Sequence, residues 1–222
     1  MTLISATDVY RFYHVGDDET RALRGVSLSV EPGELVVLLG SSGSGKSTLL
    51  ACLSGLDDPD GGQVDIAGTR LSRRPEGQRA RLRGEHIGIM LQSGNLLPHL
   101  NVLENALLTG KLLGRPDAAR ARQLLLDVGL EHRLHAYPSQ LSGGETARAG
   151  LVAALTHNPR ILLADEPTAE VDSETEDKVA SVIEAFVKQP GGHCALIATH
   201  SGRFAGRASR VLRLRDGRWQ DA

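Results

Sequence analysis

A short apolar run followed by a glycine-rich loop constrains this chain more than any other stretch. The run at 36–39, Val-Val-Leu-Leu, is short enough for a buried strand and breaks at Gly40. The following residues fit the pattern Gly-x-x-x-x-Gly-Lys-Ser, which is typical of a phosphate-binding loop between a strand and a helix. A plain strand-to-helix connection is the alternative, and the Lys-Ser pair after a buried strand disfavours it. The stretch therefore predicts a nucleotide phosphate site.

Each residue type in this loop has a chemical purpose. Glycines allow backbone conformations that turn several N–H groups toward one anion, and the N-terminus of the following helix adds to the attraction. Lys46 supplies a point charge for the β and γ phosphates, and the Ser47 hydroxyl is placed to ligate Mg²⁺. We therefore expect a bound nucleotide, with Mg²⁺ as cofactor. The residues expected around the phosphates are Gly40, Ser41, Ser42, Gly43, Ser44, Gly45, Lys46, Ser47 and Thr48.

Charge and apolar content limit the classes of function. The formal net charge is -2 and the isoelectric point is about 6.4, which disfavours a general nucleic-acid-binding surface. No stretch approaches the roughly eighteen apolar residues of a membrane span. Cys52 and Cys194 lie beside apolar residues and in no metal-binding spacing, which is typical of buried, reduced thiols in a cytoplasmic protein. The chain is expected to be soluble, with any membrane role exerted through a partner.

Apolar runs alternate with helical patterns along the chain, and several runs end in polar residues. This order indicates an α/β fold with a mainly parallel sheet and a site at the carboxyl ends of its strands. Between 102 and 154 the apolar residues recur at helical spacing, which predicts an inserted helical block. A helix is also predicted at 173–188, with Ser173 as N-cap and Glu176 three residues on. Strands are predicted at 3–11, 23–30, 36–39, 63–66, 85–92, 161–164 and 194–198, with a polar turn at 17–19 and a hairpin over 211–219.

The segment 70–83 is locally basic. A nucleic-acid patch is one interpretation, but no aromatic residue is interleaved for base stacking. A solvated helix is therefore the preferred interpretation.

The run 161–164 ends in two carboxylates, Asp165 and Glu166. In an enzyme with a phosphate-binding loop, Asp165 would hold Mg²⁺ directly or through water, and Glu166 could polarise the attacking water. Strands often end in acidic turns, so the pattern is weak alone and gains weight from the phosphate loop in the same chain.

The segment 141–145, Leu-Ser-Gly-Gly-Glu, allows two interpretations. Ser142 and Glu145 have the spacing of a capping box, so the segment could simply start a helix. Alternatively, Ser142 and the backbone of the two glycines form a second phosphate site at a helix N-terminus. Local physics leaves both open.

The motifs together resemble the nucleotide-binding domain of ATP-binding cassette (ABC) proteins. The segments 40–47, 141–145 and 161–166 occur in the order and approximate spacing of that family, with Gln92, Asp172 and His200 at matching places. The resemblance covers nearly the whole chain. Details at 95–98, 102–105 and 165–168 resemble the subgroup that serves lipoprotein-release, macrolide-export and cell-division-type permeases.

The resemblance implies a phosphate-loop ATPase made of one domain, 1–222. Its expected parts are a RecA-like core with an N-terminal antiparallel β subdomain, at 1–92 and 159–222, and a helical signature subdomain at 93–158. Catalysis would fall to Glu166 as general base, His200 as γ-phosphate ligand, Gln92 and Lys46. Metal contacts would come from Ser47, Gln92 and Asp165. Tyr13 aligns best with the aromatic residue that stacks on adenine, ahead of Tyr10 and Phe12, which would face the other side of the strand.

The resemblance also implies how the chain assembles. Two copies would pack head to tail, so that each ATP lies between the phosphate loop of one subunit and the signature of the other. Asp172 would belong to the loop that contacts the opposite subunit. The signature residues are Leu141, Ser142, Gly143, Gly144 and Glu145.

The expected partner is a transmembrane permease, which would hold the chain at the cytoplasmic, inner face of the cell membrane, with no nucleic acid involved. ATP-driven closing and opening of the homodimer would move the transmembrane helices. A mechanical signalling module is the second hypothesis, in which a permease-like partner controls an extracytoplasmic hydrolase. A third, an ABC ATPase acting on ribosomes or DNA, is disfavoured because those proteins usually carry two cassettes or long coiled-coil insertions.

Three places depart from the subgroup pattern. Thr146 and Ala147 stand where two glutamines are common, and Ala153 stands where an arginine is usual. The segment 169–172, Ala-Glu-Val-Asp, replaces the commoner Gly/Ala-Asn-Leu-Asp. The catalytic side chains remain, so we expect activity, and the departures bear on the strength of the dimer interface and on the rate.

Overall fold

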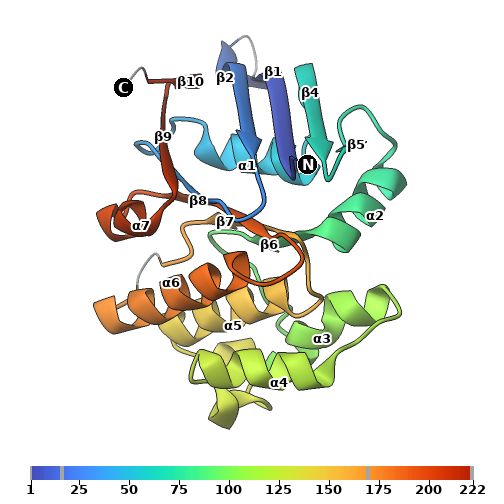
Figure 1. Ribbon diagram of the computed structural model, residues 1–222, viewed down its shortest axis with the longest axis vertical. Coiled ribbons are helices and arrows are strands. Elements are labelled where there is room, and N and C mark those ends of the chain that lie inside the picture. The colour runs from blue at the N-terminus through green and yellow to red at the C-terminus, as the bar shows by residue number, and fades with distance from the viewer. Residues whose placement is uncertain (1, 16–17, 169–170, 221–222) are drawn as a thin grey trace.

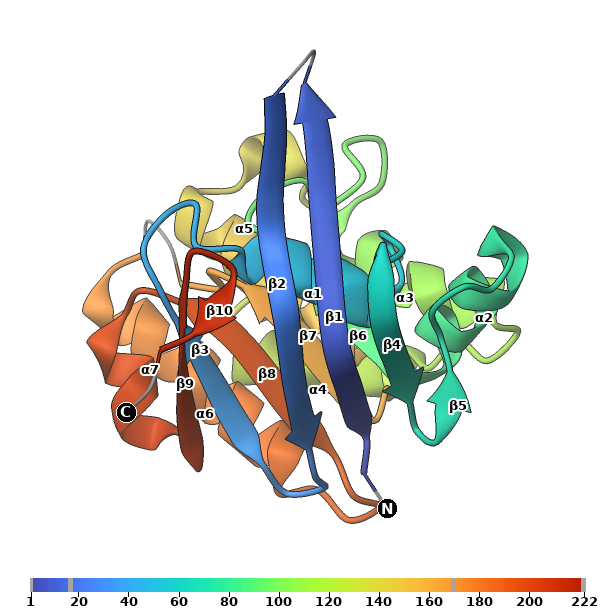
Figure 2. The same cartoon turned by 90° about the horizontal axis from the view of Figure 1, so that it is seen from above.

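Two sheets with one helix between them form the framework of the protein, and most of the other helices lie beyond the far face of the larger sheet (Figure 1). The computed structural model describes residues 2–15, 18–168 and 171–220. The smaller sheet is antiparallel in the order β2-β1-β4-β5. Its strands are β1 (Ile4–Val15), β2 (Asp18–Val30), β4 (Gly61–Ile66) and β5 (Thr69–Arg70). Figure 2 shows β1 and β2 as one long hairpin that extends beyond the larger sheet.

The larger sheet has the order β10-β9-β3-β8-β7-β6 and is parallel except for the terminal β9–β10 hairpin. Its strands are β3 (Leu35–Leu39), β6 (Ile87–Met90), β7 (Ile161–Asp165), β8 (Cys194–Thr199), β9 (Arg210–Arg215) and β10 (Arg218–Trp219). Leu39 pairs with Thr199, and Asp165 pairs with Ala198. The predicted α/β fold with a mainly parallel core sheet is therefore confirmed, and β7 and β8 bring polar residues to the edge at which β3 also ends.

Alternate residues of the central strands enter two separate cores. In β3, Val36 and Leu38 pack beneath the antiparallel sheet and α1 (Lys46–Ser54), whereas Leu35 and Val37 pack against the helices on the other face. The same alternation holds in β7 and β8. Because both faces are covered, these strands read as continuous apolar runs rather than alternating ones.

The helices that follow β6 occupy the segment 93–158, where the sequence predicts a helical block. They are α3 (Val102–Leu112), α4 (Ala118–Asp127), the short 3-10 turns η1 (Glu131–Arg133) and η2 (Pro138–Gln140), and α5 (Gly143–Leu155). Asn101 caps α3 through a complete capping box with Glu104. The remaining helices are α2 (Glu76–His86), α6 (Ser173–Val187) and α7 (Gly202–Arg207). Among the described residues, none of the helices combines the length and the apolarity that crossing a bilayer requires.

Several predicted boundaries are wrong. Asp18 and Glu19, placed in a turn, already belong to β2, because the hairpin ladder continues to the Val15–Asp18 pair; residue 17 lies outside the described part. Arg70 pairs in β5, so the basic helix starts later, at Glu76. The strand predicted from 85 starts at 87 because α2 runs directly into β6 without a turn residue.

The N-cap of α6 is also different from the prediction. Asp172 caps the helix, not Ser173, because the Asp172 carboxylate accepts the Thr175 backbone N–H at 2.9 Å while its own backbone stays extended. The terminal hairpin is confirmed. Both cysteines are buried, as predicted, and burial raises the pKa of each thiol to about 12.

A buried histidine makes the folded state sensitive to acid. His157 follows α5, and its Nε2 lies 3.3 Å from the Ile87 carbonyl oxygen while Nδ1 has no hydrogen-bond partner. Burial, helped by the charges of Arg115 and Arg120, lowers the pKa of His157 from 6.5 to about 4. Between these pH values the unfolded chain binds the proton and the folded one does not. This contribution to stability is therefore present in full above pH 6.5 and lost as pH falls toward 4.

Replacing His157 by Gln is expected to remove this acid sensitivity. The difference in unfolding free energy between wild type and the His157→Gln variant should shift by about 3 kcal/mol between pH 7 and pH 4, because the variant side chain has no proton to gain. Urea unfolding at a series of pH values measures this. The exposed His135 supplies the control, His135→Gln. A pH-independent difference for His157→Gln would contradict the assignment.

Candidate active site

The predicted phosphate loop lies between β3 and α1 and forms the floor of a cavity of about 860 Å³. Gly45 is the N-cap of α1 with φ of 104°, and a Cβ there would lie 2.5 Å from the Ala22 carbonyl oxygen, so only glycine fits. The first turn of α1 carries no acidic residue that would compete with a bound anion. The loop is thus shaped to receive phosphate oxygens.

The Lys46 side chain folds back and bonds to the backbone of the phosphate loop. Its Nζ donates to the Gly40 carbonyl oxygen at 2.7 Å and to the Ser41 carbonyl oxygen at 3.1 Å. The side chain is largely buried, so the ammonium group lies at the cavity wall with little freedom. These bonds hold the charge where a phosphate chain would pass along the loop.

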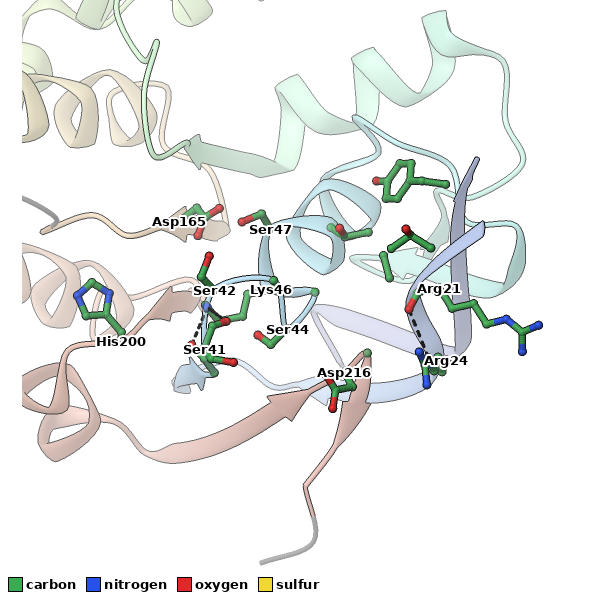
Figure 3. Close-up of a pocket in the computed structure, with 18 of the residues that line it drawn as sticks. Arg21, Arg24, Ser41, Ser42, Ser44, Lys46, Ser47, Asp165, His200 and Asp216 are labelled. Carbon is green, nitrogen blue, oxygen red and sulfur yellow. Dashed lines mark hydrogen bonds between the residues drawn. The ribbon is translucent and has the colours of Figure 1, made fainter. Parts of the chain in front are cut away.

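The side chains of Asp165 and Ser47 lie next to each other at the cavity (Figure 3). Burial raises the pKa of Asp165, and the nearby Glu166 charge acts in the same direction, while a hydrogen bond with Ser47 and the Lys46 charge oppose the shift. Gln92, just beyond the end of β6, reaches the same cavity. A hydroxyl, a carboxylate and an amide oxygen are hard donors of the kind that Mg²⁺ prefers beside phosphates, so this donor set fits the ion.

Glu166 is held by two residues from the end of β8. Its backbone lies in the left-handed region, with φ of 49°, and its N–H donates to the Ala198 carbonyl oxygen at 2.8 Å. One carboxylate oxygen, Oε2, accepts the Thr199 hydroxyl at 3.0 Å, and Oε1 lies 2.9 Å from His200 Nδ1. The carboxylate is thereby turned toward the cavity and fixed at both oxygens, which suits a group that must accept a proton from a positioned water.

Tyr13 is the aromatic residue at this cavity. Its hydroxyl donates to Asp57 Oδ2 at 3.0 Å, and the Arg11 guanidinium lies 4.7 Å from the ring centroid. Burial, followed by the bond to Asp57, raises the pKa of Tyr13. Tyr10 and Phe12 contact each other instead, with ring centroids 6.2 Å apart, and neither lines the cavity.

The segment 141–145 does not reach the phosphate-loop cavity. Ser142 caps α5 through a complete capping box: Ser142 Oγ accepts the Glu145 N–H at 3.2 Å, and Glu145 Oε2 accepts the Ser142 N–H at 2.8 Å. The backbone bond, followed by Arg133, lowers the pKa of Glu145. Ser142, Gly143 and Gly144 line a separate hollow of about 450 Å³.

The same hollow contains Asp172, whose two oxygens accept the backbone N–H and the hydroxyl of Thr175. These bonds lower the pKa of Asp172. Arg148 donates to the Thr175 hydroxyl at 2.9 Å and extends the network. Of the departures from the subgroup pattern, Thr146 donates its hydroxyl to the Ser142 carbonyl oxygen, Ala153 packs on the helical core, and 169–170 lie outside the described residues.

Some lining residues escape sequence reasoning. Arg21 and Arg24 come from β2, and Asp216 from the β9–β10 turn, because Gly217 hydrogen-bonds both to Ser44 and to Arg24. A local sequence pattern cannot show that Arg21 and Asp216, nearly two hundred positions apart, line the same cavity. The sequence does contain a signal for Thr199 as a site residue, because this polar residue stands at the carboxyl end of an apolar run, directly before His200.

Thr199 is expected to position Glu166. Replacing Thr199 by Val keeps the shape but removes the hydroxyl that Glu166 accepts, so kcat for ATP hydrolysis should fall about 10- to 100-fold with little change in KM. The Thr199→Ser variant keeps the hydroxyl and should retain most of the rate. Steady-state kinetics of the purified chain tests this, and equal losses in both variants would argue against a positioning role.

Comparisons with known proteins agree with this geometry. The family model described as ABC transporter matches residues 23–169. The lipoprotein-releasing system ATP-binding protein LolD of Novosphingobium aromaticivorans is 42% identical over 220 residues, covering 97% of each chain. An ABC transporter ATP-binding protein of Mycobacterium tuberculosis is 43% identical over 93% of this chain and 84% of its own. Among solved structures, the ATP-binding cassette MJ0796, a dimer in a post-hydrolysis state bound to ADP and Pi, matches with a TM-score of 0.93 and 32% identity, covering 99% of this chain and 97% of that one.

Proposed function

The chain belongs to the ABC transporter family as an ABC-type ATPase, and we propose that it powers a separate transmembrane permease of the lipoprotein-release or macrolide-export type. The relative named for lipoprotein release matches along nearly its whole length, which supports this subgroup. The residues at 95–98 and 102–105 that resemble the subgroup lie directly beyond β6 and at the start of α3.

Two copies complete each other's sites in this proposal. The phosphate loop and the signature line different hollows of one chain, and Ser142 and Gly143 are exposed. A head-to-tail pair would place the signature of one copy over the phosphates held by the other, where the N-terminus of α5 attracts negative charge. MJ0796, which shares the fold, has been solved as a dimer.

The geometry supports a single-step hydrolysis with Glu166 as the base. A water oxygen bonds to the γ-phosphorus, its proton passes to a Glu166 carboxylate oxygen, and the bond from the γ-phosphorus to the β–γ bridging oxygen breaks, releasing ADP and phosphate. Lys46 and the loop N–H groups stabilise the developing charge, and His200, beside Glu166, meets the γ-phosphate. Mg²⁺, when held near Ser47, Asp165 and Gln92, neutralises phosphate charge.

The proposed docking surface lies beside Gln92. A groove of about 280 Å³ is lined by Leu56 of the α1–β4 connection and by Leu91 and Gln92 after β6, and it also touches Ser47 and Asp165. Leu56, Leu91 and the nearby Leu97 are 47%, 44% and 41% exposed, and a group of exposed apolar side chains is typical of a protein contact surface. A permease segment seated here would contact residues that also line the ATP cavity. This continuity is the observation that supports the proposal, in which the chain lies peripherally on the inner face of the membrane.

Co-purification tests the proposal. A tagged Glu166→Gln chain, recovered from its own cells in mild detergent with ATP and Mg²⁺, should bring down a multi-span permease, identified by mass spectrometry. The exchange Leu97→Glu should abolish recovery, whereas Leu126→Glu, at an exposed leucine of α4, should not. Ribosomes, DNA or no membrane protein would overturn the transport assignment while leaving the ATPase. A permease found with an extracytoplasmic hydrolase would instead favour the signalling alternative.

A further inference from the structure

A second groove, separate from the proposed docking surface, lies between the helices of the helical layer. It runs along one face of α6 from Glu174 to Gln189 and is closed on its other side by α4. Helix α5 packs against both α4 and α6 and forms the floor between them (Figure 1). The volume of about 510 Å³ falls within the range of pockets that hold small molecules.

The floor of this groove is apolar and recessed. Leu124 of α4, Leu155 of α5 and Phe186 of α6 meet there, and all three are buried. Val182 and Ala185 form the wall on α6, with Ala185 exposed. An apolar chain lying along the groove would remove its own surface and the exposed part of the α6 wall from water, which gives a favourable free energy in proportion to the area covered.

One end of the groove carries a cation without an anionic partner. Arg120 donates through Nε to the Leu155 carbonyl oxygen at 3.3 Å and through Nη2 to Gln189 Oε1 at 3.5 Å, both long bonds to neutral oxygens. Within the part of the chain that the structure describes, Arg120 forms no ion pair with a carboxylate. Burial lowers the pKa of Arg120 against the opposing effect of the Asp117 charge, so water supports the charge of Arg120 only in part.

Three of the four other ionised groups that line the groove belong to ion pairs, and the fourth, Asp127, bonds to a neutral amide. Lys178 pairs with Glu174 at 2.8 Å, and Asp177 pairs with Arg207 at 2.7 Å. Asp127 accepts a bond from Gln123 at 2.8 Å and lies seven residues along α4 from Arg120, roughly 10 Å by helical rise. At physiological salt such a separation screens its repulsion of an anion bound at Arg120. The groove therefore offers one open positive site at the end of an apolar trough.

We propose that this groove binds a single-chain amphiphile with one carboxylate group, the carboxylate on Arg120 and Gln189 and the apolar chain over Leu124, Leu155 and Phe186. A carboxylate on the guanidinium would replace long neutral bonds with charge-assisted ones. The occupant is a free molecule rather than a bilayer surface, because the floor is recessed between two helices and only an extended chain reaches it. Since α4 and α6 both line the groove, the bound molecule would hold these helices together.

Calorimetric titration with decanoate, below its micelle concentration, tests the proposal. Wild type should bind one equivalent, and decan-1-ol, which has the same chain without the charge, should bind at least tenfold more weakly. The Arg120→Gln variant should lose at least tenfold in affinity, whereas Arg122→Gln, at an exposed arginine of the same helix, should bind like wild type. In case Arg120→Gln proves unfolded by circular dichroism, Ala185→Trp gives an independent test, because an indole at this exposed wall fills the trough without entering the core.

Several outcomes would overturn the proposal. They are the absence of decanoate binding to wild type, equal affinity for decan-1-ol, unchanged binding by Ala185→Trp, and the same affinity in folded Arg120→Gln and Arg122→Gln. Sedimentation with phosphatidylglycerol vesicles, in the absence of decanoate binding, would indicate a membrane surface instead and would equally refute it.

Discussion

The Glu166→Gln variant is expected to bind ATP with an affinity close to wild type while hydrolysing it about 10²- to 10⁴-fold more slowly, the usual contribution of a positioned general base. The amide is nearly isosteric and can still accept the Thr199 hydroxyl, so the site should keep its shape. It cannot take up the water proton. Because the nucleotide would stay intact between two copies, the variant should also form an ATP-dependent dimer, visible by size-exclusion chromatography with light scattering.

A matched exchange separates this effect from a general loss of charge. Glu131, an exposed residue of η1, gives the Glu131→Gln control, which should hydrolyse ATP like wild type. If Glu166→Gln turned over ATP at the wild-type rate, Glu166 would not be the base, and the bond between Glu166 and His200 would need another explanation.

Replacing Lys46 by Ala is expected to remove most of the affinity for ATP and ADP. The ammonium group would donate charge-assisted bonds to phosphate, worth about 1.5–3 kcal/mol, which corresponds to a loss of roughly 10- to 150-fold in Kd. The variant also loses the bonds to the Gly40 and Ser41 carbonyl oxygens, which shape the loop. Calorimetric titration with ADP and Mg²⁺ measures the change.

Two further variants isolate the charge. Lys46→Met keeps the aliphatic stem that packs in the loop and should lose nearly as much affinity as the alanine variant. Lys178→Ala, at an exposed lysine of α6, should bind nucleotide like wild type. Unchanged nucleotide affinity in both Lys46 variants would refute the phosphate-site interpretation.

The sequence predicts the core strands well because their burial leaves little choice. The apolar runs at 36–39, 161–164 and 194–198 are all strands, since alternate residues enter two different cores and none can be polar. The end of each run then places Gly40, Asp165 and Thr199 at one edge. The parallel sheet and the shared edge at its strand carboxyl ends are therefore the part of the site that pattern alone anticipates.

Other features, such as helix caps, some element boundaries and long-range contacts, depend on the three-dimensional structure and have no signal in the sequence pattern. Asp172 and Ser173 are both good N-cap residues, and the backbone conformation decides between them. Helix α2 ends at His86 and β6 starts at Ile87, with no glycine, proline or turn between them, so the sequence has no helix-terminating signal at this boundary. Arg21 and Asp216 reach the cavity only because the antiparallel sheet and the last hairpin both pack against the phosphate loop.

The hydrogen bonds that hold the Glu166 carboxylate join residues far apart in the sequence, and this separation has a kinetic consequence. The bonds from Lys46 span only five and six residues, so the phosphate loop can take shape as soon as β3 and α1 meet. Those from Glu166 to Thr199 and His200 span 33 and 34 residues and require β7 and β8 to be paired to their last residues. Contacts of long sequence separation form late because chain closure must precede them. During refolding, nucleotide binding should therefore recover before turnover, and a chain with frayed strand ends would hold ATP without consuming it.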